Sequence, residues 1–164
     1  PIKSSAASDV YKRQAVTMSD SSGVIENAYI VINGNLIEYI GKEKPETEDF
    51  DYVIDGENKV VMPGLVNTHT HLAMTLLRSY ADDMNLQDWL FNKIFPFEDK
   101  LMADDILKGS EIGVDEMLAG GTTCFNDMYM FQAETGRVAL KKGIRAVLSD
   151  CVNFDGYDLS LIHI

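Results

Sequence analysis

The sequence has little cysteine and little positive charge, and both shortages exclude classes of protein. Its 164 residues include two cysteines, Cys124 and Cys151, which make neither a disulfide framework nor a closely spaced metal pair. Lysine and arginine number 14 against 26 aspartate and glutamate residues, which gives a formal net charge of −12. So acidic a chain repels nucleic acid and anionic membranes, and we expect a small-molecule ligand and a reducing, cytoplasmic compartment.

Long apolar runs are also absent. No run approaches the roughly 18 residues that a membrane-spanning helix needs, and no charged-then-apolar leader of the secretory kind is present. The sequence has no internal repeat and no glycine-rich phosphate loop. With 46% hydrophobic residues, it is expected to be a soluble chain with one sizeable core.

The two ends differ from the sequence between them. Residues 1–14 are locally basic within an acidic chain, and residues 159–164 form an apolar stub. Both resemble translated sequencing-adapter sequence, so we expect them to be non-native and leave them out of the fold prediction. The alternative is a native disordered tail and a native final strand. Between them we expect a small β segment over residues 15–62 and a truncated α/β domain over residues 63–158.

The β segment shows turn signals between apolar stretches. Residues 15–18 form a short β-prone stretch, and residues 28–40 hold two apolar stretches around Asn33-Gly34, which predicts a hairpin. Residues 52–62 predict a second hairpin, with Asp55-Gly56 at its bend.

After Pro63-Gly64, strand-like and helix-like segments alternate, which is typical of a parallel α/β fold. We expect strands over residues 65–71, 122–128 and 144–149, and helices over residues 104–119 and 134–142. The apolar positions expected on the inner faces of these helices are Ile106, Leu107, Ile112, Met117, Leu118, Val138 and Leu140. Three strands and two helices amount to less than half of a (β/α)8 barrel, which needs about 250 residues.

His69 and His71 are the sharpest chemical signal. Side chains alternate along a strand, so histidines at a spacing of two share one face, and Thr68 and Thr70 point the other way. Two neighbouring imidazoles can bind one Zn²⁺ or Fe²⁺ ion, and such a metal activates water for hydrolysis. The alternative is a pair of strand histidines held by ordinary hydrogen bonds.

The run from Val61 to Leu72, with Pro63-Gly64 before the strand and His69-Thr70-His71 at its end, strongly resembles the first-strand motif of the amidohydrolase superfamily. This resemblance implies a TIM-like (β/α)8 barrel preceded by a small β-sandwich segment. It also implies one divalent metal, zinc or else iron, held first by the histidine pair. The remaining ligands and the catalytic acid and base would then lie beyond the chain, and His163 receives no role.

Further stretches resemble one branch of the superfamily, the 5-methylthioadenosine/S-adenosylhomocysteine deaminases and their chlorohydrolase relatives: residues 73–83, 86–90, 95–99 and 121–129. By this resemblance Glu98 binds the nucleoside ribose and Trp89 lines the same pocket. Alternatively, Glu98 is a solvated surface carboxylate, and Trp89 anchors an amphipathic helix with Leu86 and Leu90.

Three other positions carry open interpretations. Asp127 ends a strand and either supports the site or caps the following turn. Arg78 and the Asp82-Asp83 pair can form an ordinary solvated salt bridge. Some deaminases of this branch have a substrate-binding arginine after the third strand, where this sequence has Asp150, and that weakens the case for a carboxylate-bearing substrate.

We therefore expect a metal-dependent hydrolytic deaminase of an adenine nucleoside, incomplete and inactive as this chain alone, and a homo-oligomer as one option for the full-length protein. One alternative is a related amidohydrolase, such as a guanine deaminase or a triazine chlorohydrolase. The other is a non-catalytic α/β binding module in which His69 and His71 are structural.

Overall fold

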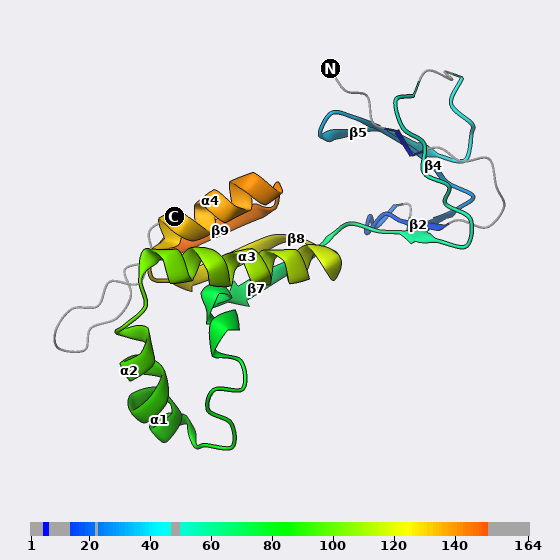
Figure 1. Cartoon of the computed structure of the whole chain (residues 1–164). Helices are drawn as coiled ribbons and strands as arrows, with labels where there is room; N and C mark the ends of the chain where they lie inside the picture. The colour runs from blue at the N-terminus through cyan, green and yellow to red at the C-terminus, as the bar shows by residue number, and fades with distance from the viewer. Residues whose placement is uncertain (1–4, 7–13, 22, 47–49, 151–164) are drawn as a thin grey trace. The chain divides into compact units, whose positions relative to one another are not determined.

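The computed structural model describes residues 5–6, 14–21, 23–46 and 50–150 (Figure 1). The chain divides into two compact units, Pro1–Pro63 and Gly64–Ile164. Within the described residues, no helix is both long enough and apolar enough to cross a membrane.

The first unit contains two three-stranded sheets, with strand orders β1-β4-β5 and β3-β2-β6. Their strands are β1 (Ser5–Ala6), β2 (Gln14–Val16), β3 (Val24–Glu26), β4 (Tyr29–Asn33), β5 (Leu36–Gly41) and β6 (Val60–Val61). The predicted hairpin is confirmed, because β4 and β5 pair antiparallel. Its two-residue loop is Gly34-Asn35, and Gly34 has a φ of 62°, which glycine adopts without strain.

The second predicted hairpin is wrong. Only Val60–Val61 forms a strand, and it pairs parallel with β2 rather than with residues 52–54. The Asp55 carboxylate accepts a hydrogen bond from the Glu57 amide (3.0 Å), and the Lys59 amide donates to the Gly56 carbonyl (3.0 Å). This tight local turn uses the backbone groups that would otherwise extend an antiparallel ladder.

Part of the expected non-native leader takes part in strand pairing. Ser5–Ala6 pairs with Val31 and Ile30, and Gln14 pairs with Glu26 and Val60. These pairings do not depend on the origin of residues 1–14, because a β-ladder is made by backbone groups that any sequence carries. The non-native origin of both ends stays a prediction, and residues 159–164 are outside the described residues.

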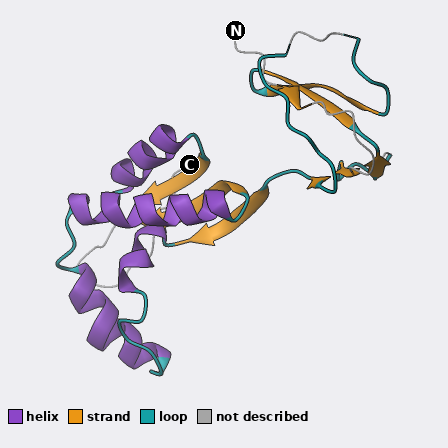
Figure 2. Ribbon diagram, turned by 45° about the vertical axis from the view of Figure 1, so that its right-hand side comes forward, coloured by secondary structure: helices purple, strands orange, loops and turns teal. Residues whose placement is uncertain are grey.

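The second unit is a parallel α/β layer (Figure 2). Strands β7 (Leu65–Thr70), β8 (Thr122–Tyr129) and β9 (Arg145–Asp150) lie in that order and are all parallel. Helices α3 (Ala103–Ala119) and α4 (Gln132–Lys142) connect them and pack against each other. All three predicted strands and both predicted helices are confirmed, and α4 ends at Gly143, whose φ is 74°.

The connection between β7 and α3 is largely helical. A 3₁₀ helix, η1 (Leu72–Leu77), follows β7 directly. Later come α1 (Leu86–Trp89), a π-helical turn η2 (Leu90–Ile94) and α2 (Phe95–Glu98), which run on from one another. A π-helical turn of this kind is often found near functional sites.

Two buried clusters hold the second unit together. One contains Leu72, Val114, Phe125, Val138, Ala139 and Ile144. The other contains Ala73, Leu101, Ile106 and Tyr129. Leu72 and Ala73 are neighbours in sequence but belong to different clusters, so the start of η1, directly after His71, is anchored on both sides.

The predicted inner faces of the helices are partly wrong. Ile112, Leu118 and Leu140 are 46%, 38% and 86% exposed. The predictions for Ile106 and Val138 are confirmed, since both are buried, and the other buried positions on α3 are Gly109, Ser110, Gly113 and Val114. A Cβ atom on Gly109 would lie 2.6 Å from the Ala73 carbonyl oxygen, so η1 approaches α3 too closely for larger residues. The pattern of hydrophobic residues ignores glycine, so the buried face of α3 at Gly109 and Gly113 was not recognised and Ile112 and Leu118 were assigned to it.

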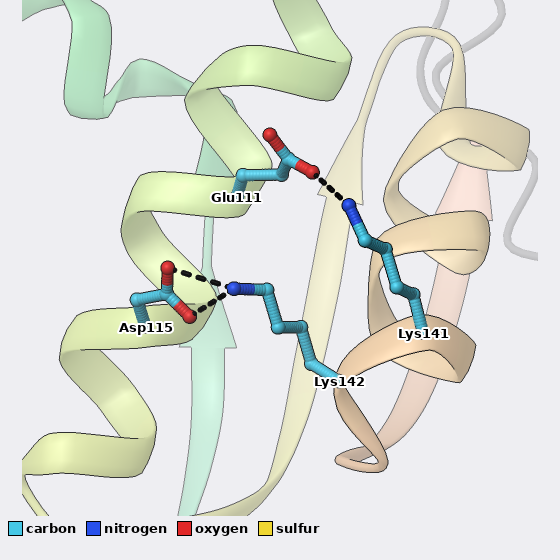
Figure 3. Close-up of polar contacts among 4 residues, drawn as sticks. All are labelled: Glu111, Asp115, Lys141 and Lys142. Atoms are coloured by element: carbon cyan, nitrogen blue, oxygen red, sulfur yellow. Dashed lines mark hydrogen bonds and ion pairs between the residues drawn. The ribbon is translucent and has the colours of Figure 1, made fainter.

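Ion pairs join the outer surfaces of α3 and α4 (Figure 3). Lys141 Nζ lies 2.9 Å from Glu111 Oε1, and Lys142 Nζ lies 2.6 and 2.9 Å from the two oxygens of Asp115. Both lysines come from the last turn of α4, where positive charge also complements the helix dipole.

Candidate metal and substrate site

The rings of His69 and His71 lie next to each other at the carboxyl end of β7. Their centroids are 5.0 Å apart and the ring planes meet at 82°. This separation leaves both rings free to direct a nitrogen toward one ion. The structure therefore brings together the two residues predicted as metal ligands, and their metal-binding role stays a prediction.

Strand β7 is irregular where it carries His69. Asn67 pairs with Phe125 and Thr70 with Asp127, so three steps on β7 oppose two steps on β8, which is a β-bulge. Side chains replace the lost ladder bonds: the His69 amide donates to Asn67 Oδ1 (3.3 Å), and Asn126 Nδ2 donates to the Thr68 carbonyl (3.1 Å). Bulges commonly redirect side chains beside active sites, and strict strand alternation alone does not describe this segment.

The orientation of His71 suits a metal ligand. Its Nδ1 lies 2.7 Å from the carbonyl oxygen of Met128. Because a carbonyl can only accept, Nδ1 is assigned the proton, and Nε2 keeps its lone pair. A ring held in this way by a backbone carbonyl has the tautomer and orientation that metal-ligating histidines require.

Asp127 lies beneath this segment and is only 1% exposed. Its Oδ1 accepts hydrogen bonds from Thr70 Oγ1 (2.6 Å) and the Leu72 amide (2.8 Å), and its Oδ2 accepts one from Gln132 Nε2 (2.6 Å). Sequence reasoning left Asp127 between site support and turn capping. The structure shows a buried carboxylate bonded to both neighbours of His71 as well as to the start of α4.

Glu98 lies at the end of α2, is half-buried, and accepts a hydrogen bond from the Tyr129 hydroxyl (2.6 Å). Burial raises the pKa of the Glu98 carboxyl, and the hydrogen bond from Tyr129 opposes that rise. The Tyr129 and His71 rings are 6.2 Å apart. Glu98 is therefore not a freely solvated carboxylate, and it belongs to a group with Tyr129 and His71.

Sequence reasoning did not single out Tyr129, which contacts Glu98 and lies beside His71. The available signal was its position directly after the predicted second strand, since barrel enzymes place functional residues at the carboxyl ends of strands. Tyr129 is 5% exposed, and an aromatic residue at such a position is easily taken for core.

Trp89 is half-buried at the end of α1 and lines a shallow depression with Ala81, Asp82, Asp83, Met84 and Leu86. His71 lines a different depression, together with Thr75, Arg78 and Glu116 among others. Trp89 thus lines a different depression from His71, and Glu98 lines neither of the two.

Arg78 and Asp150 both have structural partners. The Arg78 guanidinium forms a bidentate pair with Glu116 of α3, so the suggested pairing with Asp82-Asp83 is wrong. Arg78 directly follows η1, which packs against α3, the helix that carries Glu116. Asp150 Oδ1 accepts a hydrogen bond from the Gln132 amide (2.9 Å), where the helix dipole of α4 favours negative charge.

Among the described residues, no group of three or more histidine, cysteine, aspartate or glutamate side chains could hold a metal ion. The two histidines fit a divalent metal in donor type and orientation, and they make up part of a coordination shell.

The chain is similar to curated proteins over most of its length. The chain is 47% identical over 134 residues to a 5-methylthioadenosine/S-adenosylhomocysteine deaminase of Syntrophomonas wolfei, covering 82% of this chain and 31% of the relative. It is 48% identical over 133 residues to a 5′-deoxyadenosine deaminase of Methanosarcina barkeri, covering 81% and 30%. The chain thus spans about a third of the length of these curated relatives.

Two solved structures are similar in fold. An adenosine deaminase from Xanthomonas campestris with bound zinc has a TM-score of 0.65 and 28% identity, covering 90% of this chain and 34% of that one. A triazine hydrolase from Arthrobacter aurescens has a TM-score of 0.75 and 24% identity, covering 84% and 33%. The sequence profile of the amidohydrolase family matches residues 60–154, more than half of the chain. The chain belongs to the amidohydrolase family.

Proposed function

We propose that the full protein is a metal-dependent hydrolase that removes the amino group from the adenine ring of a nucleoside, of the 5-methylthioadenosine or S-adenosylhomocysteine type. The adjacent rings of His69 and His71 at the carboxyl end of β7 carry this proposal. The names of the two deaminase relatives support the substrate class. The activity is assigned to the full protein, because this chain spans only 31% of the first of these relatives.

His69 and His71 would hold one divalent metal, zinc or iron, through ring nitrogens. The metal, when bound, supplies the Lewis acidity that activates water for hydrolysis near neutral pH. The hydrogen bond from His71 Nδ1 to the Met128 carbonyl keeps Nε2 available as the donor atom. Following the family resemblance, we assign the further ligands and the proton-transferring glutamate to sequence beyond this chain.

Glu98 would bind the ribose. A carboxylate can accept hydrogen bonds from two adjacent hydroxyls, and the Tyr129 hydroxyl, bonded to Oε1, restricts the orientation of the Glu98 side chain. Trp89 would supply an aromatic wall of the same pocket once the rest of the protein encloses it. Asp150 favours a substrate with a neutral 5′ substituent, such as methylthio, because a second carboxylate would be repelled there.

The larger architecture follows from the same family resemblance. Residues 63–158 would form the first three β/α units of a (β/α)8 barrel, and residues 15–62 would be part of a small β-sandwich domain. We further propose that the full-length protein is cytoplasmic, with a homo-oligomer as one option for its assembly.

The test uses the complete open reading frame that carries this chain. Metal per chain is measured by mass spectrometry in the parent, in the double variant His69→Ala/His71→Ala, and in Thr68→Ala as the control on the same strand. We expect about one metal ion per chain in the parent and in Thr68→Ala, and loss of that ion in the double variant. Ammonia release from 5′-methylthioadenosine should follow the same order.

The outcomes separate the alternatives. A folded, metal-free parent would contradict the metal centre and leave a non-catalytic α/β binding module. A metal-loaded parent that instead deaminates guanine, or releases chloride from a triazine, would keep the metal centre and replace the adenine nucleoside as substrate.

A further inference from the structure

The Asp127 carboxylate has two sides with different partners. Oδ1 accepts hydrogen bonds from Thr70 Oγ1 and from the Leu72 amide, which are the residues directly before and after His71. Oδ2 accepts a single hydrogen bond from Gln132 Nε2 at the start of α4. Oδ1 therefore binds the segment that contains His71, and Oδ2 binds the start of helix α4.

The next residue on β8 completes the contact with His71. The Met128 carbonyl accepts the hydrogen bond from His71 Nδ1 (2.7 Å). Asp127 thus fixes the backbone on both sides of His71, and Met128 fixes the ring. These three contacts determine where Nε2 lies relative to the neighbouring His69 ring.

The burial of Asp127 argues for a specific role. Burying a carboxyl group to 1% exposure costs free energy unless its oxygens are hydrogen-bonded. The side-chain bonds of Asp127 go to Thr70, Leu72 and Gln132, so they form only when β7, η1 and α4 are in their observed positions. The β-bulge removes the regular ladder between Asn67 and Thr70, so backbone pairing alone does not set the path of the chain at this point. The Asp127 carboxylate on β8 bonds to Thr70 and Leu72 and so holds this part of the chain against β8, where the regular strand pairing is interrupted.

We infer that Asp127 is a positioning residue for the metal centre, which acts by holding His71 in place through Thr70 and Leu72 rather than by binding the metal or the substrate. This inference rests on the proposed function, since it assumes that His69 and His71 bind a metal. Residues that orient metal ligands in this way typically contribute about 10- to 100-fold to metal affinity.

Three variants separate positioning from general stability. Asp127→Ala removes both sides of the carboxylate. Asp127→Asn can keep Oδ1 on Thr70 and Leu72 while its amide group faces Gln132. Within the described part of the chain, the buried Gln132 side-chain oxygen has no hydrogen-bond partner, and rotation of that amide would let it accept the new donor. Gln132→Leu removes only the partner of Oδ2 and leaves the His71 side intact.

The measurement is zinc affinity of the full-length protein, by competition with a chelating dye, together with the absorption spectrum of the cobalt-substituted protein. We expect Asp127→Ala to weaken zinc affinity about 10- to 100-fold and to change the cobalt spectrum. Asp127→Asn should restore both toward the parent. Gln132→Leu should lower the denaturation midpoint while leaving zinc affinity and the cobalt spectrum unchanged.

If Asp127→Ala does not fold, Thr70→Val takes its place in the experiment. Valine has nearly the same shape as threonine but lacks the hydroxyl that donates to Asp127 Oδ1. Thr70→Val should weaken zinc affinity and leave Gln132 in place. Folded Asp127→Ala or Thr70→Val protein with parental zinc affinity would overturn the inference, as would an equal loss of affinity in Gln132→Leu. A parent that binds no metal would instead overturn the proposed function on which the inference rests.

Discussion

The hydroxyl of Tyr129 donates a 2.6 Å hydrogen bond to the carboxylate of Glu98, 31 residues earlier in the sequence. This bond joins the carboxyl end of β8 to the last residue of α2. The Tyr129 ring also lies 6.2 Å from the ring of His71. A residue proposed to bind substrate is thereby held at a defined position beside the proposed metal ligands.

Removing this bond should affect substrate binding more than turnover. In Tyr129→Phe, Glu98 keeps its charge but loses the group that orients it. We expect KM for the nucleoside to rise about 10-fold with a smaller change in kcat, since hydrogen bonds to charged groups are typically worth about 1.5–3 kcal/mol. Steady-state kinetics of ammonia release measures both constants.

Tyr80→Phe is the matched control for that variant. The Tyr80 ring packs 5.1 Å from Phe97, next to Glu98, and Tyr80 is 48% exposed. The same loss of a hydroxyl at Tyr80 should leave KM unchanged. An equal rise in KM in both variants would argue that Tyr129 acts only through the stability of the region.

The close contact between α3 and η1 makes a specific prediction for stability. A Cβ atom on Gly109 would lie 2.6 Å from a backbone carbonyl, which cannot move aside as a side chain can. We expect Gly109→Ala to lower the free energy of unfolding by about 1–3 kcal/mol, in the range of other overpacking substitutions. Urea denaturation followed by circular dichroism measures the change.

Gly136→Ala applies the same chemical change inside α4 with the opposite expected result. Its new Cβ would meet only Leu148 Cδ1, at 3.3 Å, the movable end of a side chain. Alanine should stabilise the helix by about 0.4–1 kcal/mol. Equal destabilisation by both substitutions would contradict the close contact of η1 with α3.

The ion pair between Asp115 and Lys142 should contribute little and depend on salt. The Asp115 side chain is 57% exposed and that of Lys142 is 28% exposed. A double-mutant cycle with Asp115→Asn and Lys142→Met should give a coupling of about 0.2–1 kcal/mol at low salt. That coupling should shrink in 1 M salt, where the Debye length is about 3 Å, and an undiminished value would indicate a desolvated pair.

The ion pair between Arg78 and Glu116 should contribute to the stability of the fold only at pH values where Glu116 is ionised. The hydrogen bonds from Arg78 lower the pKa of Glu116 below its ordinary value of 4.5. A pKa lowered by folding gives stability that is fully present above 4.5 and is lost as pH falls through the lower, folded value. The stability difference between parent and Glu116→Gln should therefore be present at neutral pH and be lost as the pH falls below 4.5 through the lowered pKa of the folded protein. In an Arg78→Gln background, Glu116→Gln should have no such pH-dependent effect.

The sequence predicted the strands and helices of the second unit well because each signal there is local. Glycines follow the ends of α3 and α4, and apolar segments mark β7, β8 and β9. The second hairpin failed because Val60–Val61 pairs with β2, more than 40 residues earlier in the chain, and local pattern carries no information on that choice.

The two histidines of the candidate site could be predicted from the sequence. The residues that hold His71 and Glu98 in position could not. His69 and His71 are recognisable from spacing and from the surrounding motif. Tyr129 and Asp127 act through contacts between segments that only the folded chain brings together. The bulge in β7 is likewise set by the pairing of two strands and not by the residues of one.

Leu72 and Ala73 enter different buried clusters, and the bulge in β7 lies only a few residues before them. Inserting one residue between Asn67 and Leu72 would move Leu72 into the place of Ala73, and deleting one would move Ala73 into the place of Leu72. Segment length here is thus fixed by packing and cannot vary as in an ordinary loop. Crossover points for chimaeric proteins built from this family therefore belong outside residues 67–73, even where the parents match closely in sequence.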